Sequence, residues 1–494
     1  MSRSITIYNS LSREKVPFKP IVEERIGMYV CGPTVYNDVH LGNCRTFVSF
    51  DIIYRYLLFA GFKVRYVRNI TDVGHLLDNG EDRMAKGARL EQLEPMEVSQ
   101  KYTNGFHEMM RIFNTLSPSI EPRATGHIIE QIKMIEDILA RGFAYIKNGS
   151  VYFDTPKFIN DGYPYGQLSG RIVEELVAES RDNLKNQDEK NHPADFALWI
   201  KASEEHIMRW ESPWSVGFPG WHLECSAMST KYLGETFDIH GGGNDLKFPH
   251  HENEIAQSMG SCGHPPANYW LHTNMLLLNG KKMSKSDGNT ISPQELFTGN
   301  SDHISKAFSP MVIKFFMLQA HYRSPLDITD EALQAAEKGY KRLMEAFKLV
   351  CNLDPELSTS GTKDQEILSI IDQSLMYMDD DFNVPNALAS LFELASILNS
   401  FNDGHIKSSE IGLNVWNQLK THFNVLITDI FGLKDEQNTE DKSTTNGLMH
   451  LIIDLRKDIR ERKDWASADK IRDSLFALGI QLKDGKDGTS WKKN

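Results

Sequence analysis

Residues 27–67 read GMYVCGPTVYNDVHLGNCRTFVSFDIIYRYLLFAGFKVRYV, and this stretch decides the fold. It opens on an apolar extended run, Gly27 to Cys31, which ends in the turn-forming Gly32-Pro33-Thr34. Phe47 to Phe59 has the apolar spacing of a helix, and Lys63 to Val67 is a second strand-like run. A strand, a helix and a strand in succession predict two parallel strands joined by a crossover helix, and hence an α/β fold.

The same alternation returns later in the chain, which divides the sequence into segments. Residues 1–130 and 220–309 are expected to be the two halves of one Rossmann-like, doubly wound parallel sheet. Short strands and a charged loop at Arg181 to His192 interrupt them, so residues 131–219 are expected to be an insertion. The remaining divisions follow from helical spacing and from a stretch without apolar side chains: a helical bundle over 310–432, a linker over 433–446 and a small module over 447–494.

Composition bounds the class of protein. The chain has 494 residues, of which 40% are apolar and 24% charged, as in ordinary globular proteins of about three domains. No apolar run reaches the roughly 18 residues of a membrane span and the N-terminus lacks a signal peptide's apolar region, so we expect a cytoplasmic protein. The five cysteines are too few and too scattered for a disulfide framework; Cys44, Cys262 and Cys351 suggest no role beyond packing.

The charge is unevenly distributed. The formal net charge of −13 argues against a protein that coats nucleic acid indiscriminately. Residues 447–494 nevertheless carry 11 Lys and Arg against 8 Asp and Glu. A local basic face for a specific nucleic-acid partner therefore remains open.

His40-Leu41-Gly42-Asn43 lies between the first strand and the first helix. A helix N-terminus presents free N–H groups and a partial positive charge, which suit phosphate, and Gly42 allows close approach to the backbone. The His40 imidazole and the Asn43 amide could donate hydrogen bonds to phosphoryl oxygens in a transition state. Taken alone, the four residues are equally compatible with a structural histidine.

Two further polar stretches suit a nucleotide. Lys281 to Asn289 follows the apolar run Met275 to Leu278, and its lysines could clamp a triphosphate. Gly241-Gly242-Gly243-Asn244-Asp245 follows the strand-like Thr236 to His240, and its glycines could let a base or ribose lie against the backbone, with Asp245 accepting from hydroxyls. The alternatives are a solvated basic loop for the first stretch and a tight turn for the second.

A metal site is a fourth possibility. In the stretch Pro249 to Glu254, the proline suits the first turn of a helix, and His250 and Glu254 then share one helical face. These two residues could be half of a site, with Cys31 and Cys225 as the other half, a set of ligands that suits Zn²⁺. Spacing alone leaves buried structural roles open, because the ligands come from three separate segments.

Together these stretches resemble the class I aminoacyl-tRNA synthetases. His40 to Asn43 is similar to that family's HIGH signature, and Lys282 to Ser286 matches its KMSKS signature letter for letter. Within the class, the chain is similar to the cysteinyl-tRNA synthetases from about residue 22 to the C-terminus. The stretches that carry this similarity are Met28 to Tyr36, Gly220 to Met228, Asp238 to Gln257, Lys463 to Ala466 and Gly488 to Trp491.

The resemblance implies a zinc-dependent selection of cysteine. Cys31, Cys225, His250 and Glu254 would bind one zinc ion, which could take the thiolate of substrate cysteine but not the hydroxyl of serine. Gly32, Thr71 and Trp221 would complete the amino-acid pocket beside Cys31. Because such selection rejects a near-isostere, no editing domain is expected, and the insertion over 131–219 would be a small acceptor-end module.

The resemblance also implies a two-step reaction with tRNA(Cys), ATP and L-cysteine, carried out by a monomer. Cysteine would attack the α-phosphate of ATP to give cysteinyl-adenylate, and a terminal ribose hydroxyl of the tRNA would then take the cysteinyl group. Mg²⁺ would accompany ATP, and catalysis would be positioning and charge stabilisation. The residues implied for ATP are His40, Gly42, Asn43, Lys282 and Lys285 at the phosphates and Gly241, Gly242, Gly243 and Asp245 at adenosine.

The C-terminal module resembles an anticodon-binding domain. Arg460, Trp465, Asp469 and Asp484 match positions that would meet unpaired anticodon bases by stacking and hydrogen bonding. The alternative is that Trp465 and Trp491 are core residues of a small domain and that the carboxylates are solvated.

The chain departs from the signature at Asn43, which stands where a second histidine is usual. Its amide still donates hydrogen bonds, so ATP activation should be retained, in altered form. Two rival functions remain: a ligase that passes cysteine to a small-molecule amine, and an inactive paralogue that binds tRNA. The C-terminal module argues against the first, and the intact lysine motif and the four metal-ligand candidates argue against the second.

Overall fold

The computed structural model describes residues 3–73, 93–171, 189–204, 206–283, 289–436, 440–461, 464–477, 480–485 and 488–493. The chain forms two compact units, Met1–Leu433 and Lys434–Asn494. Among the described residues, no helix is both long and apolar enough to cross a membrane.

The centre of the first unit is a four-stranded parallel sheet of order β10-β9-β3-β4. Its strands are β3 (Arg25–Val30), β4 (Lys63–Arg68), β9 (Phe237–Gly243) and β10 (Ala267–Thr273). The register places Met28 opposite both Tyr66 and Ile239. The strands from residues 1–130 and those from residues 220–309 therefore lie side by side in one sheet, as expected for its two halves. The predicted α/β fold class is confirmed.

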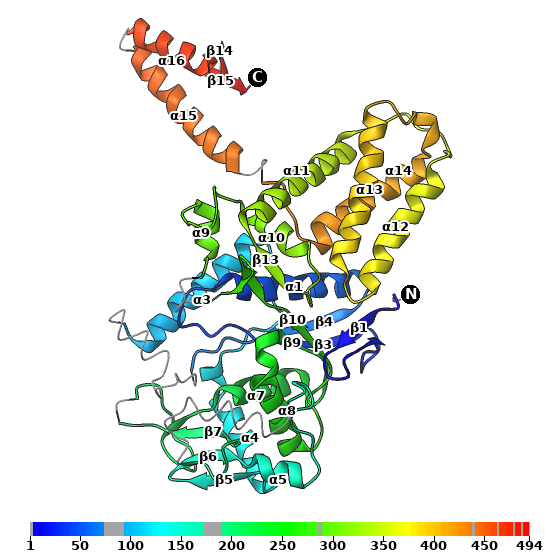
Figure 1. Cartoon of the computed structure of the whole chain (residues 1–494). Helices are drawn as coiled ribbons and strands as arrows, with labels where there is room; N and C mark the ends of the chain where they lie inside the picture. The colour runs from blue at the N-terminus through cyan, green and yellow to red at the C-terminus, as the bar shows by residue number, and fades with distance from the viewer. Residues whose placement is uncertain are drawn as a thin grey trace. The chain divides into compact units, whose positions relative to one another are not determined.

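Helices cover both faces of this sheet (Figure 1). On one face lies α1 (Leu41–Phe59), and on the other lie α7 (Trp221–Leu233) and α8 (His250–Cys262). Most of α1 is buried, since its outer side is in turn covered by α10 (Pro310–Leu318). Because both of its sides are covered, α1 buries charged side chains such as Arg45, Asp51 and Arg55 as well as apolar ones.

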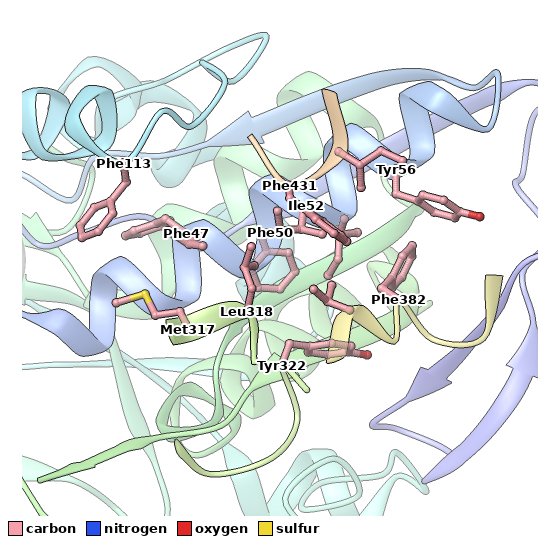
Figure 2. Close-up of a cluster of buried hydrophobic side chains, with 14 of the residues drawn as sticks. Phe47, Phe50, Ile52, Tyr56, Phe113, Met317, Leu318, Tyr322, Phe382 and Phe431 are labelled. Carbon is pink, nitrogen blue, oxygen red and sulfur yellow. The ribbon is translucent and has the colours of Figure 1, made fainter. Parts of the chain in front are cut away.

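Figure 2 shows the side chains that hold α1 in place. Phe47 and Phe50 of α1 lie beside Met317 and Leu318 of α10, and Tyr56 of α1 lies at the far end of the cluster. Aromatic side chains from three other segments complete it. Those aromatic side chains are Phe113, Phe382 and Phe431. Burying a large ring contributes about 2–3 kcal/mol, so this cluster is a principal stabiliser of the unit.

The insertion is a separate small layer with its own aromatic core. Its antiparallel sheet has the order β5-β6-β7-β8, and Phe153 and Phe196 stack across neighbouring strands at 4.8 Å. The elements of the insertion are α4 (Ile128–Ala140), β5 (Ala144–Lys147), β6 (Ser150–Phe153), α5 (Thr155–Asn160), β7 (Phe196–Lys201) and β8 (Gly217–Pro219). It is preceded by α3 (Pro95–Ile112), which packs on α1, and by η1 (Ala124–His127). The expected boundary after residue 130 falls inside α4, which packs on α7 and α8. Most of the charged loop at 181–192 lies outside the described residues.

A second short sheet leads into the helical bundle. It has the order β12-β11-β13, from β11 (Leu276–Leu278), β12 (Lys281–Lys282) and β13 (Leu326–Ile328). Helix α11, which follows β13, begins after Thr329, whose side chain caps the helix by accepting a hydrogen bond from the N–H of Ala332. The remaining elements of the unit are β1 (Thr6–Asn9), β2 (Glu14–Pro17), η3 (Asn244–Lys247), α9 (Pro293–Thr298), α11 (Asp330–Asn352), α12 (Asp364–Asp379), α13 (Val384–Asn402), η4 (Ser408–Glu410), α14 (Leu413–Asn424) and η5 (Val425–Ile430).

The second unit consists of α15 (Glu440–Glu461), α16 (Trp465–Ala477) and a hairpin of β14 (Ile480–Gly485) and β15 (Gly488–Lys493). The helix α15 begins at Glu440, inside the stretch 433–446 that was expected to be a linker, so this expectation is corrected.

Asp381 joins the bundle to the rest of the first unit. It lies between α12 and α13, is fully buried, and accepts hydrogen bonds from the Tyr8 N–H at 2.9 Å, the Tyr322 hydroxyl at 2.7 Å and Arg323 Nε at 2.6 Å. Its neighbour Asp380 is exposed and makes an ion pair with Lys15 at 2.7 Å. Adjacent carboxylates thus have opposite environments.

We expect Asp381→Asn to lower the free energy of unfolding by about 2 kcal/mol, because an amide NH2 would replace the buried carboxylate oxygen that accepts from the partly exposed Arg323. Asparagine tolerates the positive φ of 61° at this position, so backbone strain is not added. Asp380→Asn is the matched control, with an expected change below about 1 kcal/mol. Denaturant unfolding of the full chain measures both, and equal losses would contradict the assignment.

Candidate active site and metal centre

The site lies where the chain reverses its direction across the parallel sheet. From β3 the chain passes through α1 to β4, and from β9 it passes through α8 to β10, toward the opposite edge. Ligands of such sheets bind beyond the carboxyl ends of the two strands at the reversal. Here those strands are β3 and β9, and the Cys31 N–H, just past β3, donates to the Gly241 carbonyl at 3.0 Å.

Four potential metal ligands converge at this point. Cys31 Sγ lies 3.5 Å from both Cys225 Sγ and Glu254 Oε1, and His250 Nε2 lies 3.4 Å from Cys225 Sγ and 3.2 Å from Glu254 Oε1. All four side chains are buried, and one ligand atom from each lies within 4.8 Å of the others. The first cysteine follows β3, the second belongs to α7, and the other two share a face of α8.

The chemistry of this cluster suits a divalent cation. Burial raises the pKa of the Cys31 thiol well above its usual range and raises that of Cys225 as well. Two thiols and a carboxylate so close together in a dry interior cannot all be ionised unless a cation compensates their charge. Two sulfurs, one imidazole nitrogen and one carboxylate oxygen form a donor set that fits Zn²⁺.

His240 is a residue of this site that sequence reasoning missed. Its Nε2 lies 2.8 Å from Glu254 Oε2, so the other carboxylate oxygen faces Cys31 and His250. The His240 ring is fully buried and stacks on Trp270 with centroids 4.3 Å apart. A second possible ligand set shares Cys31 and Glu254 but uses His240 and His251. The His240 contact to Glu254 and the bond of His251 Nδ1 to His272 Nε2 at 2.8 Å favour supporting roles for both histidines.

The expected amino-acid pocket residues lie beside the cluster. Asn69 accepts a hydrogen bond from the Gly32 N–H at 2.8 Å and donates to Thr71 Oγ1 at 3.0 Å, which ties these two residues together. Only glycine fits at position 32, because a Cβ there would lie 1.6 Å from the Asn69 carbonyl oxygen. Trp221, at the start of α7, lies with its ring 4.5 Å from that of His250. The sequence offered no sign of the role of Asn69.

The N-terminus of α1 has the form expected of an anion site. His40 is the N-cap residue, and its Nδ1 accepts a hydrogen bond from the Asn43 N–H at 3.3 Å. A Cβ at Gly42 would lie 2.9 Å from His40 Nδ1, so glycine lets the imidazole fold over the first turn. No acidic side chain lies in this turn to neutralise the positive end of the helix.

The three glycines are placed differently from the turn that was expected. Gly241, Gly242 and Gly243 are the last residues of β9, and the turn begins only at Asn244. A Cβ at Gly241 would lie 2.2 Å from the Phe50 ring, so this glycine permits the close packing of α1 on the sheet. Its structural role is therefore established by packing, whereas Gly243 is half-buried at the end of the strand and Asp245 is exposed in η3.

The lysine motif is described in part. Lys282 is exposed on β12, where it pairs with Leu277 of β11. Lys285 lies outside the described residues, as do the other residues of 284–288.

In the second unit, Trp465 is 57% exposed, and the Arg460 guanidinium lies over its ring at 5.8 Å. This exposure excludes the alternative that Trp465 is a core residue. Asp469 is exposed and forms an ion pair with Arg472 at 2.9 Å, and Asp484 pairs with Thr489 across the hairpin.

Comparison with known proteins agrees with this arrangement. Residues 17–338 match the family described as the tRNA synthetase class I (C) catalytic domain. A cysteine–tRNA ligase of Bacteroides thetaiotaomicron is 51% identical over 500 residues and covers all of both chains. The chain belongs to the cysteine–tRNA ligase family of class I aminoacyl-tRNA synthetases. The cysteine–tRNA ligase of Deinococcus radiodurans is 46% identical and covers 99% of this chain and 97% of its own.

Two further comparisons concern the helical bundle and the overall fold. Residues 376–433 match the DALR domain, which therefore falls on the later helices of the bundle and ends before the second unit. The structure of Mycobacterium tuberculosis methionyl-tRNA synthetase with methionyl-adenylate has a similar fold, with a TM-score of 0.60 over 83% of this chain and 92% of that one at 15% identity. The resemblance inferred from the sequence motifs is thus confirmed.

We expect the cysteine–tRNA ligase fold to hold one zinc ion per chain through the four converging side chains. Cys225→Ser should reduce the zinc content to a small fraction of one, because a hydroxyl is a poor zinc ligand beside a thiolate. Elemental analysis after gel filtration measures it. The matched control is Cys44→Ser, which also replaces a buried thiol on a helix but should leave the zinc content unchanged. A full zinc complement in Cys225→Ser would contradict the site.

Proposed function

We propose that the protein is a zinc-dependent cysteine–tRNA ligase that forms cysteinyl-adenylate from L-cysteine and ATP and transfers the cysteinyl group to the 3′ end of tRNA(Cys). The observation that carries this proposal is the buried cluster of Cys31, Cys225, His250 and Glu254 at the carboxyl ends of β3 and β9. It lies on the same edge of the sheet as the start of α1, where a nucleotide phosphate would be favoured.

Cysteine is selected by its sulfur in this proposal. Zinc would supply a Lewis-acidic position that binds the substrate thiolate in preference to a hydroxyl. Gly32 and Thr71, both held by Asn69, line the pocket together with Trp221 and orient the amino acid. His240 holds the Glu254 carboxylate in its orientation, as outer groups do for metal ligands.

ATP is activated by charge stabilisation. The cysteine carboxylate attacks the α-phosphorus, the bond from that phosphorus to the oxygen that bridges the α- and β-phosphates breaks, and pyrophosphate leaves. Mg²⁺ bound to ATP would offset part of the phosphate charge. His40 and Asn43 donate hydrogen bonds to the phosphates at the positive end of α1. Gly42, which has no side chain, lets the phosphates come close to the backbone there. Lys282 and Lys285 balance the charge of the triphosphate. Adenosine lies against the accessible end of the glycine stretch, at half-buried Gly243 and exposed Asp245, while Gly241 and Gly242 are buried behind it and shape this end of β9.

The second unit would recognise the anticodon. Exposed Trp465, with Arg460 over its ring, offers a surface on which an unpaired base can stack. Asp469 and Asp484 would accept hydrogen bonds from base edges. The insertion 131–219 would meet the acceptor end of the tRNA. We further propose that the protein works as a cytoplasmic monomer, which its family resemblance supports.

The deciding experiment is aminoacylation of total tRNA by the purified full chain with ATP and Mg²⁺, using labelled cysteine or serine before and after zinc removal. Charging with cysteine alone, lost with the metal and restored by zinc, is the expected result. Cysteine-dependent pyrophosphate exchange without tRNA charging would replace the proposal by a small-molecule ligase. No reaction in either assay would favour an inactive tRNA-binding paralogue.

We expect Asn43→Ala to lower kcat for pyrophosphate exchange by about tenfold or more and to leave the KM for cysteine unchanged, since one donor to the developing charge is lost. The substitution retains the backbone N–H that donates to His40, so it tests the amide alone. Asn43→His, which restores the usual signature, should stay within a few-fold of the natural protein. Unchanged exchange by Asn43→Ala would show that its side chain does not act on the phosphates.

A further inference from the structure

Two separate elements carry the proposed phosphate-binding groups. His40 and Asn43 lie at the start of α1, and Lys282 lies on β12 of the short three-stranded sheet. For both to act on one triphosphate, the distance between these elements must be held to within a fraction of an ångström, because a misplacement of about 1 Å can cost about 100-fold in rate. Some contact must therefore fix the position of α1 relative to the short sheet.

Arg45 makes that contact. It lies in the second turn of α1, is only 1% exposed, and reaches four backbone carbonyl oxygens with its two terminal nitrogens. The distances are 3.1 Å to Asn274, 2.8 Å to Met275, 3.3 Å to His321 and 2.5 Å to Ser324. The first two carbonyls lie between β10 and β11, and the other two precede β13.

The two segments that Arg45 joins are themselves paired. The Asn274 N–H donates to the Tyr322 carbonyl at 2.8 Å, and the Asn274 side chain donates to the Arg323 carbonyl at 2.8 Å. Beyond them β11 and β13 run parallel, and β11 pairs with β12, which carries Lys282. A displacement of the carbonyls would therefore displace the strand from which Lys282 projects.

The contact is also electrostatically unusual. Within the described part of the chain, Arg45 has no ion pair, and its Nε has no hydrogen-bond partner. Burial lowers the pKa of Arg45 to about 10, so it remains charged at neutral pH. A buried cation surrounded by carbonyl dipoles costs more than an ordinary packing residue would, and the planar guanidinium is suited to bind several oxygens at fixed angles.

We propose that Arg45 is a positioning residue for ATP activation that sets the distance between the His40 end of α1 and the Lys282 strand through its four carbonyl contacts. The inference rests on the proposed function, because it assumes that both elements act on ATP. Its role differs from that of Lys282, since Arg45 is buried and acts through the protein backbone.

The first test compares Arg45→Lys with a matched control on the same helix. Arg55 is also buried and also donates to backbone carbonyls, of Asn114 at 2.8 Å and Asp429 at 3.1 Å, but it holds α1 to other segments and pairs with Asp51. Lysine keeps the charge in both variants but loses the fork of donors. We expect Arg45→Lys to lower kcat for cysteine-dependent pyrophosphate exchange at least about tenfold, with KM for cysteine unchanged, and Arg55→Lys to lower thermal stability with kcat retained.

The second test asks whether Arg45 acts through Lys282. In a double-mutant cycle, Arg45→Lys should change kcat less than about threefold when Lys282→Ala is already present, because the group that it positions is gone. Additive effects of the two substitutions, or equal losses of kcat in Arg45→Lys and Arg55→Lys, would overturn the inference. No exchange by the unsubstituted protein would refute the proposed function itself, which separates the two failures.

Discussion

The parallel pairing of β3 with β9 is the interaction on which the rest of the structure depends. It places the end of the first strand beside a strand that follows the whole insertion, with Val30 opposite Gly241. Because parallel strands end at the same edge, this pairing delivers Cys31 to the elements that carry Cys225, His250 and Glu254. The close approach of α1 above it requires Gly241, since any side chain there would occupy the place of the Phe50 ring. The pairing of β3 with β9 therefore determines both the register of the sheet and the position of the site.

Helix α1 combines structural and functional roles along its length. Its first turn offers uncompensated N–H groups and a histidine cap, its second turn anchors the short sheet through Arg45, and its middle supplies the aromatic core in Figure 2. Farther along, Arg55 and Asp51 tie it to neighbouring segments. A helix restrained at so many points is a rigid support, and rigid supports are what charge stabilisation by prearranged groups requires. The carboxylate of Asp381 provides the corresponding restraint for the bundle.

Several features of the fold and site could be predicted from local sequence, and others could not. The strand, helix and strand over residues 27–67 were evident from periodicity, and the signature motifs identified the family. The tight turn offered as the alternative for Gly241 to Gly243 is wrong, because these glycines are the last residues of β9. At Gly241 the reason for glycine is a ring from another element rather than a local bend. Glu440 started a helix in a stretch that composition alone assigned to a linker. His240, Asn69 and Arg45 carried no recognisable signal, since each acts on groups far away in the sequence.

The sequence by itself determined the alternation of strands and helices, the glycine and proline breaks, and the residue types able to bind phosphate or metal, because these depend on neighbours within a few positions along the chain. Even the pairing of His250 with Glu254 on one helical face follows from a spacing of four. Only the tertiary structure decided that two cysteines from distant segments meet this pair, and that burial raises the pKa of both thiols. Desolvation and ligand geometry depend on what surrounds a group in three dimensions, and spacing along the chain carries no information about that surrounding.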